Sequence, residues 1–546
     1  MLAVCDLICA CIGQIRTERH KSRNFCITHG DALLMEQSNH AAADQSPAHY
    51  DTFVIGGGIN GAGIARDAAG RNQSVCLCDS GDFGGGTSSA STKLVHGGLR
   101  YLEYYEFRLV REALIEREEL LQMAPHIIWP MRFVLPHHSG LRPAWLLRLG
   151  LFLYDHLGGR KLLPATKTLD LTTDPAGQIL KSDFKKGFEY SDCWIEDSRM
   201  VILNLQQAAE NGARILPRTA IQTAVYQQDK WLLTLNNRVT GDTFQVTANV
   251  VVNSSGPWAD EILKGVFGLN HANNVRLVGG SHIVIRRTLP FDRSYIFQAT
   301  DDRVIFIIPY EKDFLLVGTT DTENNDLHTP PKITQSEIDY LCESASEYLN
   351  DAIIPEDVVW TFSGVRALYN DGASQAQGAT RDYVVRENNE LGGPLINVFG
   401  GKITTYRKLA EEVVSRVCNY LGQPNQPWTS GTRLPGGHFP VDGYEDLVSK
   451  IKQDYAFISK RLARRLARLY GTDSFKMLAQ KNSLGALGQH FGGELYAAEV
   501  DYLVQNEWVQ QAEDLLYRRT KLGLVLSDDE QVELSAYLEE NQQQQL

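Results

Sequence analysis

The sequence predicts an α/β protein built from more than one domain. Three observations support this fold class. The chain has 546 residues, which is too long for one hydrophobic core. A strand, a glycine turn, a helix and a second strand follow one another directly after the first 48 residues. From residue 435 to the end, only helical periodicity is found.

The overall charge and the cysteines exclude several kinds of partner and site. The formal net charge is -13, which argues against nucleic acid as the main partner but permits a local basic pocket. The 9 cysteines lack metal-ligand or paired spacing, so we expect no metal site and no disulfide framework. No run of apolar residues is long enough to predict a membrane-spanning helix.

The first 48 residues differ from the rest of the chain. An apolar start is interrupted by Asp6, and a polar stretch without periodicity follows. We interpret residues 1–48 as a disordered extension, or residues 1–34 as untranslated sequence upstream of a true start at Met35. A signal sequence or a lipid-attached cysteine remains the alternative.

The segment Asp51–Ser80 contains a complete dinucleotide-binding pattern. A short apolar strand leads into G-x-G-x-x-G at Gly56, Gly58 and Gly61, and a second strand ends at Asp79. The glycines permit a tight turn and the close approach of a pyrophosphate, which the helix N-terminus attracts with free N–H groups. Asp79 is expected to accept a hydrogen bond from a ribose hydroxyl.

Two later segments also end a buried strand in small residues. Residues 250–260 contain Ser255 and Gly256, and residues 398–414 contain Gly400 and Gly401 before an amphipathic helix. Three separate glycine turns suggest a large cofactor that passes through the whole domain, which favours FAD over NAD. Between them, the run TKLVHGGLRYL at residues 92–102 gathers basic groups around a glycine pair.

Long motifs then identify a family. GGGINGAGIARDAAGR, TSSASTKLVHGGLRYLE, GFEYSDCW, SGVRAL and FGGKITTYRKLAE make the chain resemble the FAD-dependent, aerobic glycerol-3-phosphate dehydrogenases of bacteria over about residues 49 to 540. The resemblance implies a glutathione-reductase-like FAD-binding Rossmann domain, a mixed-sheet substrate cap of the D-amino-acid-oxidase type and a C-terminal helical domain. The chain departs from the family pattern in the glycine-rich DFGGGTSS and in Ala367, where proline is expected.

The resemblance also implies the reaction and its residues. The enzyme would oxidise sn-glycerol 3-phosphate to dihydroxyacetone phosphate, with the hydride passing to N5 of non-covalent FAD. Arg366 is expected to hold the phosphate and His282 to act as general base, so both are assigned as catalytic. The expected substrate-binding residues are Arg100, Tyr101, Arg366, Arg381 and Lys402. The expected cofactor-binding residues are Gly56, Gly58, Gly61, Asp79, Thr87, Ser88, Ser89, Lys93, His96, Gly97, Gly98, Leu99, Ala220, Ser255, Gly256, Gly400, Gly401, Lys402, Ile403 and Thr404.

The chain order predicts interleaved domains. The FAD-binding domain is expected to comprise residues 49–118, 192–271 and 378–434, and the substrate cap residues 119–191 and 272–377. Residues 435–546 are expected to form the helical domain after a glycine- and proline-rich linker. The segment from Asp197 to Gly212 is expected to be a helix with an acidic cap.

The implied electron acceptor is ubiquinone in a membrane. The protein is therefore expected in the cytoplasm or peripherally on the cytoplasmic face of the bacterial inner membrane, where it would contact an anionic surface. Residues 141–163 and 460–471 combine apolar and basic residues, a pattern that suits either a lipid interface or a solvated helix. A homodimer is kept as an alternative to a monomer.

Three other functions are compatible with the sequence. An oxidase on the same scaffold would pass electrons to dioxygen and form hydrogen peroxide. An amine or amino-acid oxidase would bind a carboxylate, which the basic cluster of Arg100, Arg366 and Lys402 argues against. A flavin-binding scaffold without turnover is a third alternative.

Overall fold

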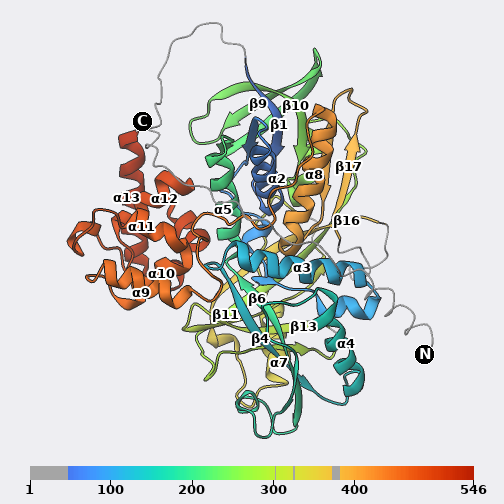
Figure 1. The fold of residues 1–546 in the computed structure, drawn as a ribbon, viewed down its shortest axis with the longest axis vertical. Helices are drawn as coiled ribbons and strands as arrows, with labels where there is room; N and C mark the ends of the chain where they lie inside the picture. The colour runs from blue at the N-terminus through green and yellow to red at the C-terminus, as the bar shows by residue number, and fades with distance from the viewer. Residues whose placement is uncertain (1–46, 302, 324–325, 372–381, 546) are drawn as a thin grey trace, which may run out of the picture. The chain divides into compact units, whose positions relative to one another are not determined.

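The computed structural model describes residues 47–301, 303–323, 326–371 and 382–545. Nearly all of the predicted N-terminal extension and the predicted substrate residue Arg381 therefore lie outside the described residues. No helix among the described residues is long and apolar enough to cross a membrane. Figure 1 shows the arrangement of the elements from Pro47 onward.

The first sheet is organised around the glycine turn. Eight strands form it within the described chain: β1 (Ala48–Ile55), β2 (Val75–Cys78), β7 (Arg214–Leu216), β8 (Thr219–Gln227), β9 (Lys230–Asn237), β10 (Thr243–Asn253), β17 (Val384–Asn388) and β18 (Leu395–Phe399). β7, β2, β1, β10 and β18 lie side by side and run parallel. Ile55 pairs with Cys78 on one side and with Asn253 on the other, so these strands end at the same edge.

Helices α2 (Ile59–Gly70), α5 (Asp197–Glu210) and α8 (Tyr406–Leu421) cover this sheet (Figure 1). The predicted strand–helix–strand unit is confirmed, because α2 connects β1 to the parallel strand β2. α2 packs closely against α8, since a Cβ on Gly63 would lie 2.7 Å from the Tyr406 ring. The predicted acidic cap of α5 is wrong: Glu196 precedes the helix without a capping hydrogen bond, and Asp197 lies in the first turn, paired with Lys93.

The second sheet is mixed and has ten strands within the described chain. They are β3 (Leu94–Val95), β4 (Ile128–His137), β5 (Lys167–Asp170), β6 (Lys186–Ile195), β11 (Val275–Ile285), β12 (Ser294–Gln298), β13 (Val304–Tyr310), β14 (Phe314–Gly318), β15 (Thr322–Glu323) and β16 (Val358–Tyr369). β4 and β12 pair in parallel, and most other neighbours are antiparallel. β3 belongs to this sheet although it lies in the chain segment predicted for the first domain.

Helices α3 (Phe107–Met123), α4 (Ala144–Leu157) and α7 (Gln335–Ser346) accompany the second sheet. One hydrophobic cluster joins Leu341 of α7 to strands β11 to β14. A second cluster joins Val110 and Leu114 of α3 and Leu151 of α4 to the opposite side of the same strands. The sheet therefore has a buried layer on each face.

The C-terminal part is helical, as the sequence predicts. It contains α9 (Tyr444–Asp454), α10 (Lys460–Tyr470), α11 (Ser474–Met477), α12 (Ala497–Glu507), the π-helix η10 (Asp514–Arg519) and α13 (Asp528–Gln545). Its helices share a hydrophobic cluster of their own, which includes Leu466, Val500 and Leu534. This part of the chain therefore has a core separate from those of the two sheets.

Candidate active site and cofactor cavity

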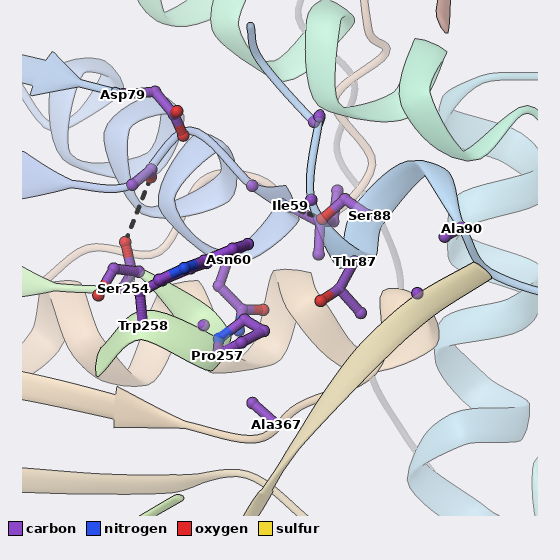
Figure 2. Close-up of a pocket in the computed structure, with 18 of the residues that line it drawn as sticks. Ile59, Asn60, Asp79, Thr87, Ser88, Ala90, Ser254, Pro257, Trp258 and Ala367 are labelled. Carbon is purple, nitrogen blue, oxygen red and sulfur yellow. Dashed lines mark hydrogen bonds between the residues drawn. The ribbon is translucent and has the colours of Figure 1, made fainter. Parts of the chain in front are cut away.

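A cavity of about 1270 Å³ lies where the parallel strands of the first sheet end, and residues of the second sheet line its other side. The crevice beside the carboxyl ends of parallel strands is where open α/β sheets bind their ligands. Its volume exceeds the range of about 300–1,000 Å³ that is typical of small-molecule sites. The turn after β1, the turn after β10 and the chain around Thr87 face one another across it (Figure 2).

The glycine turn after β1 leaves no room for side chains at two of its three positions. Gly56 has a φ of +103°, and a Cβ there would lie 2.7 Å from the Ser254 carbonyl oxygen. A Cβ on Gly61 would lie 1.9 Å from the Gly56 carbonyl oxygen. Gly58 is the N-cap of α2 and brings no side chain near the first-turn N–H groups, which can attract an anion, although that of Ile59 is bonded to the Ser88 hydroxyl.

Asp79 has a structural task that the sequence did not reveal. Its carboxylate accepts hydrogen bonds from the backbone N–H of Gly57 at 2.7 Å and of Gly81 at 2.8 Å. It thereby ties the end of β2 to the glycine turn while lining the cavity. Burial raises its pKa, and the two N–H donors act in the opposite direction. Each carboxylate oxygen has a further lone pair, so the predicted contact with a ribose hydroxyl is compatible with this geometry.

The structure brings most of the predicted cofactor residues to the cavity, although they come from distant segments. Those that line it are Gly56, Gly58, Asp79, Thr87, Ser88, His96, Ala220, Ser255, Gly256, Gly400, Gly401, Lys402, Ile403 and Thr404. Gly61, Ser89, Lys93, Gly97, Gly98 and Leu99 are not among the lining residues. Ser88 accepts a hydrogen bond from the N–H of Ile59 at 3.0 Å, which fixes it against the first turn of α2 (Figure 2).

The basic run at residues 92–102 divides between the core and the cavity. Lys93 is buried, and its Nζ donates to both carboxylate oxygens of Asp197 at 2.9 Å, so its charge is used inside the protein. This differs from the predicted cofactor contact. His96 lines the cavity, and burial lowers the pKa of its imidazole, which favours the neutral ring. Gly97 donates its N–H to the Tyr154 hydroxyl at 2.8 Å, so its role is to hold the loop.

Arg366 lies on β16 and lines the cavity. Its guanidinium forms an ion pair with Asp321 and donates to the Thr319 hydroxyl at 2.9 Å. Gly280 on β11 makes room for it, because a Cβ there would lie 2.6 Å from Arg366 Nη2. The Arg366 side chain is about 29% exposed, so it is held in place but is accessible to a ligand.

His282 lies on β11 beside Arg366 and is fully buried. Its Nε2 is 3.0 Å from the Thr92 hydroxyl, and its ring stacks on Phe362 with centroids 4.7 Å apart. Burial lowers the pKa of the imidazole well below its ordinary value, and the positive charges of Arg366 and Lys93 lower it further. The ring is therefore neutral near pH 7 and has a lone pair that can accept a proton.

The remaining predicted substrate residues do not all line the cavity. Tyr101 and Lys402 line the cavity, and Lys402 Nζ lies 3.8 Å from the centre of the Tyr101 ring. Arg100 is half-buried on the neighbouring 3₁₀ turn and is not among the lining residues. Of the predicted cluster of Arg100, Arg366 and Lys402, Arg366 and Lys402 line the cavity and Arg100 does not.

Sequence reasoning missed several lining residues. Asn60, Asp82, Arg218, Arg238, Trp258, Gln511 and Arg518 all line the cavity. Trp258 lies in the segment 250–260, directly after a glycine turn, so its position could have suggested it. Gln511 and Arg518 belong to the C-terminal helical part, where no local pattern marks a binding residue.

Comparison with known proteins gives a consistent result. The chain matches the family described as FAD dependent oxidoreductase over residues 51–407, and the C-terminal domain of alpha-glycerophosphate oxidase over residues 428–539. It is 50% identical to D-erythritol 1-phosphate dehydrogenase of Brucella abortus over 89% of this chain and 96% of that protein. It is 45% identical to aerobic glycerol-3-phosphate dehydrogenase of Escherichia coli over 91% of this chain and 98% of that protein.

Solved structures agree on the fold. The glycerol-3-phosphate dehydrogenase of Bacillus halodurans, complexed with FAD, has a TM-score of 0.70 and 26% identity, and the match covers 90% of this chain and 94% of that one. Glycine oxidase of Geobacillus kaustophilus has a TM-score of 0.52 at 19% identity over 71% of this chain and 98% of that one, a likeness of fold alone. With the glycine cradle, the large cavity and the neutral histidine in place, the chain belongs to the FAD-dependent oxidoreductases and carries the C-terminal domain of the alpha-glycerophosphate oxidases.

Proposed function

We propose that this protein oxidises the secondary alcohol of sn-glycerol 3-phosphate to dihydroxyacetone phosphate. The observation that carries the proposal is that one cavity joins a dinucleotide cradle to a buried neutral histidine and two cations, Arg366 and Lys402. A phosphorylated alcohol needs a phosphate anchor and a proton acceptor, and this end of the cavity has both. The name of the Escherichia coli relative supports the same substrate.

The residues of the cavity fit FAD, the cofactor of the family. Gly56 and Gly61 have no space for a side chain, and Gly58 at the N-terminus of α2 leaves the approach to its N–H groups open. A pyrophosphate would be held there, and Asp79 is placed for the ribose next to it. The Asn60 Oδ1 atom is buried without a partner in the described structure, and Asn60 lines the cavity beside the turn after β18.

Arg366 and Lys402 would bind the substrate phosphate. In the protein without substrate, Asp321 neutralises Arg366, so the phosphate dianion has to replace a carboxylate partner. Bidentate binding to a phosphate has the geometry that a guanidinium prefers. Tyr101, stacked on Lys402, limits where that ammonium group can move.

His282 would take the hydroxyl proton at Nε2, with the Thr92 hydroxyl as its hydrogen-bond partner beside it. When bound, FAD supplies the acceptor for the hydride that leaves the substrate carbon. Arg366 lowers the pKa of His282 in the free protein. A phosphate bound to Arg366 offsets that positive charge, so substrate binding makes the imidazole a stronger base.

D-Erythritol 1-phosphate is a second candidate substrate, because the relative named for it is 50% identical over most of the chain. Both substrates present a phosphate and a secondary alcohol, so the same anchors would serve. They differ in length, so their relative kcat/KM tells them apart.

Anaerobic addition of each sugar phosphate to the purified protein tests the proposal. Glycerol 3-phosphate is expected to bleach the oxidised flavin absorbance quickly, and unphosphorylated glycerol at the same concentration is expected to bleach it far more slowly. A higher kcat/KM with D-erythritol 1-phosphate would transfer the assignment to the second candidate. Bleaching by D-amino acids, and by neither sugar phosphate, would refute both.

For the electron acceptor we propose ubiquinone, with the protein peripheral on the cytoplasmic face of the bacterial inner membrane. Helix α4 carries the supporting feature: Trp145, Leu149 and Phe152 are exposed along one of its faces. Exposed Arg142 and Lys161 flank this helix, and basic residues beside an exposed apolar face are typical of helices that bind anionic lipid surfaces. Two arginines of α10 are instead paired within the protein, Arg464 with Glu445 and Arg465 with Glu499.

Vesicle binding and product analysis test this part. Trp145→Glu combined with Phe152→Glu is expected to weaken sedimentation with anionic vesicles, whereas Val532→Glu, at an exposed apolar position of α13, is expected to leave it unchanged. Reduction of a soluble ubiquinone analogue without hydrogen peroxide supports the quinone. Stoichiometric peroxide would identify an oxidase.

A further inference from the structure

The C-terminal helical part contributes to the wall of the cofactor cavity. Gln511 and Arg518 line the cavity, although they follow the first sheet by many residues in sequence. Arg518 lies on the π-helix η10, a backbone form that is rare and frequently found at functional sites. These residues meet the end of the cavity that is formed by the chain after β2 and by the start of β8.

Two arginines of η10 hold the chain segment that follows β2. Arg518 Nε donates to Asp82 at 2.5 Å, and Arg519 donates to both carboxylate oxygens of Asp82 at 2.8 Å. Asp82 and Arg519 are both buried. Asp82 itself lines the cavity, so its position, and that of the backbone around it, depends on the C-terminal part.

The same π-helix holds the hairpin that begins at β8. Asp514 accepts hydrogen bonds from Arg218 at 2.9 and 3.0 Å and from Arg518 at 2.6 Å. The backbone N–H of Arg218 donates to the Gly81 carbonyl at 3.0 Å, and Thr219 donates to the Asp79 carbonyl. The hairpin, the segment after β2 and η10 are therefore joined in one network of buried ion pairs and backbone hydrogen bonds.

This network surrounds the adenosine end of the expected FAD position. Asp79 marks that end, because an acid after the second strand of a dinucleotide fold binds the ribose, and the pyrophosphate lies at the N-terminus of α2. The reactive end, with His282 and Arg366, is lined by the second sheet instead.

We infer that the C-terminal helical part, through Arg518 and Asp514, is a structural component of the FAD site and increases the affinity for FAD by holding the adenosine-binding wall in place. The two residues act as positioning residues, because they hold Asp82 and Arg218. The inference rests on the family cofactor and goes beyond the proposed substrate. Its failure would leave the proposed reaction untouched.

Titration of the full-length apoprotein with FAD, followed by flavin fluorescence, tests this inference. Arg518→Gln is expected to raise the Kd for FAD about ten-fold, which is the effect of losing charge-assisted hydrogen bonds behind the binding wall. Arg518→Lys keeps the charge but cannot bond Asp82 and Asp514 with a planar fork, so an intermediate Kd is expected. The midpoint potential of the bound flavin and the KM for substrate are expected to stay unchanged, because both belong to the other end of the cavity.

Asp501→Asn is the matched control. Asp501 lies on α12 and accepts a hydrogen bond from Tyr537 at 2.9 Å within the same helical part. It is expected to leave the Kd unchanged. An unchanged Kd in Arg518→Gln, or an equal rise in both variants, would overturn the inference. If Arg518→Gln is insoluble, Asp82→Asn keeps the shape of the partner and removes its charge, and a Kd equal to that of the unmodified protein would overturn the inference in the same way.

Discussion

Replacing Arg366 with glutamine separates its role as phosphate anchor from its electrostatic effect on His282. The variant keeps a polar side chain of similar reach but removes the positive charge. In the free protein the guanidinium pairs with Asp321, and both side chains are about 30% exposed, so this pair contributes at most about 1 kcal/mol. Two charge-assisted hydrogen bonds to a phosphate contribute about 1.5–3 kcal/mol each.

The net loss of transition-state stabilisation is therefore about 3 kcal/mol, which corresponds to about a hundred-fold lower kcat/KM. A second effect follows from the electrostatics. Arg366 lowers the pKa of His282, after burial, so removing its charge raises that pKa. The acidic limb of the kcat/KM profile, where His282 is protonated and inactive, is expected to move to higher pH.

Anaerobic stopped-flow bleaching of the flavin by glycerol 3-phosphate across a pH series measures both effects. Arg276→Gln is the matched control, because Arg276 lies on β11 and pairs with Glu323. The control is expected to stay within about two-fold of the unmodified protein, as is usual for surface ion pairs. An unchanged rate in Arg366→Gln would refute the anchor, and loss of FAD would show a structural role. A reduced rate with an acidic limb at its original pH would refute the coupling to His282.

Three further predictions concern Asp321, Gly61 and His126. Asp321→Asn removes the anion that competes for Arg366, so the KM for the sugar phosphate is expected to fall up to about five-fold, and an unchanged or higher KM would contradict this. Gly61→Ala places a Cβ 1.9 Å from the Gly56 carbonyl oxygen, so the absorbance spectrum of the purified protein is expected to show little FAD. The control Gly265→Ala has open space around the added Cβ, so that variant should keep its flavin absorbance. Burial lowers the pKa of His126 well below 6.5, so the folded state disfavours protonation of its ring. The contribution of the neutral ring to the free energy of unfolding is therefore fully present above pH 6.5. It is expected to decrease by up to about 1.4 kcal/mol per pH unit as the pH falls below that value. Thermal unfolding from pH 8 to pH 5 checks this, and His126→Gln should show a shallower decrease.

The glycine turn was predictable because its requirements are local. A tight turn between a strand and a helix tolerates no side chain at Gly56 or Gly61, and the structure shows the clashes that a Cβ would cause. The strand before it and the acid after β2 follow from apolar runs of the right length. His282 was placed in the cavity only with the help of the family resemblance, since a single histidine on a strand has no distinguishing pattern.

Which basic residues line the cavity and which are paired inside the protein was not predictable in the same way. Lys93 and Lys402 look alike in sequence, yet Lys93 is neutralised by Asp197, which is 104 residues away, while Lys402 lines the cavity. Arg518 reaches Asp82 across 436 residues. No periodicity records such contacts, because they depend on how separate cores pack.

The sequence alone determined the α/β class, the dinucleotide cradle and the helical C-terminal part, because backbone sterics and hydrophobic periodicity act over a few residues. The tertiary structure decided which charges face the ligand and which are paired inside. The reason is electrostatic: a buried charge requires a partner, and the partner is whichever carboxylate the fold brings within reach. Asp197 meets Lys93 and Asp321 meets Arg366, so one cation is committed to the core and the other can exchange its carboxylate partner for a phosphate.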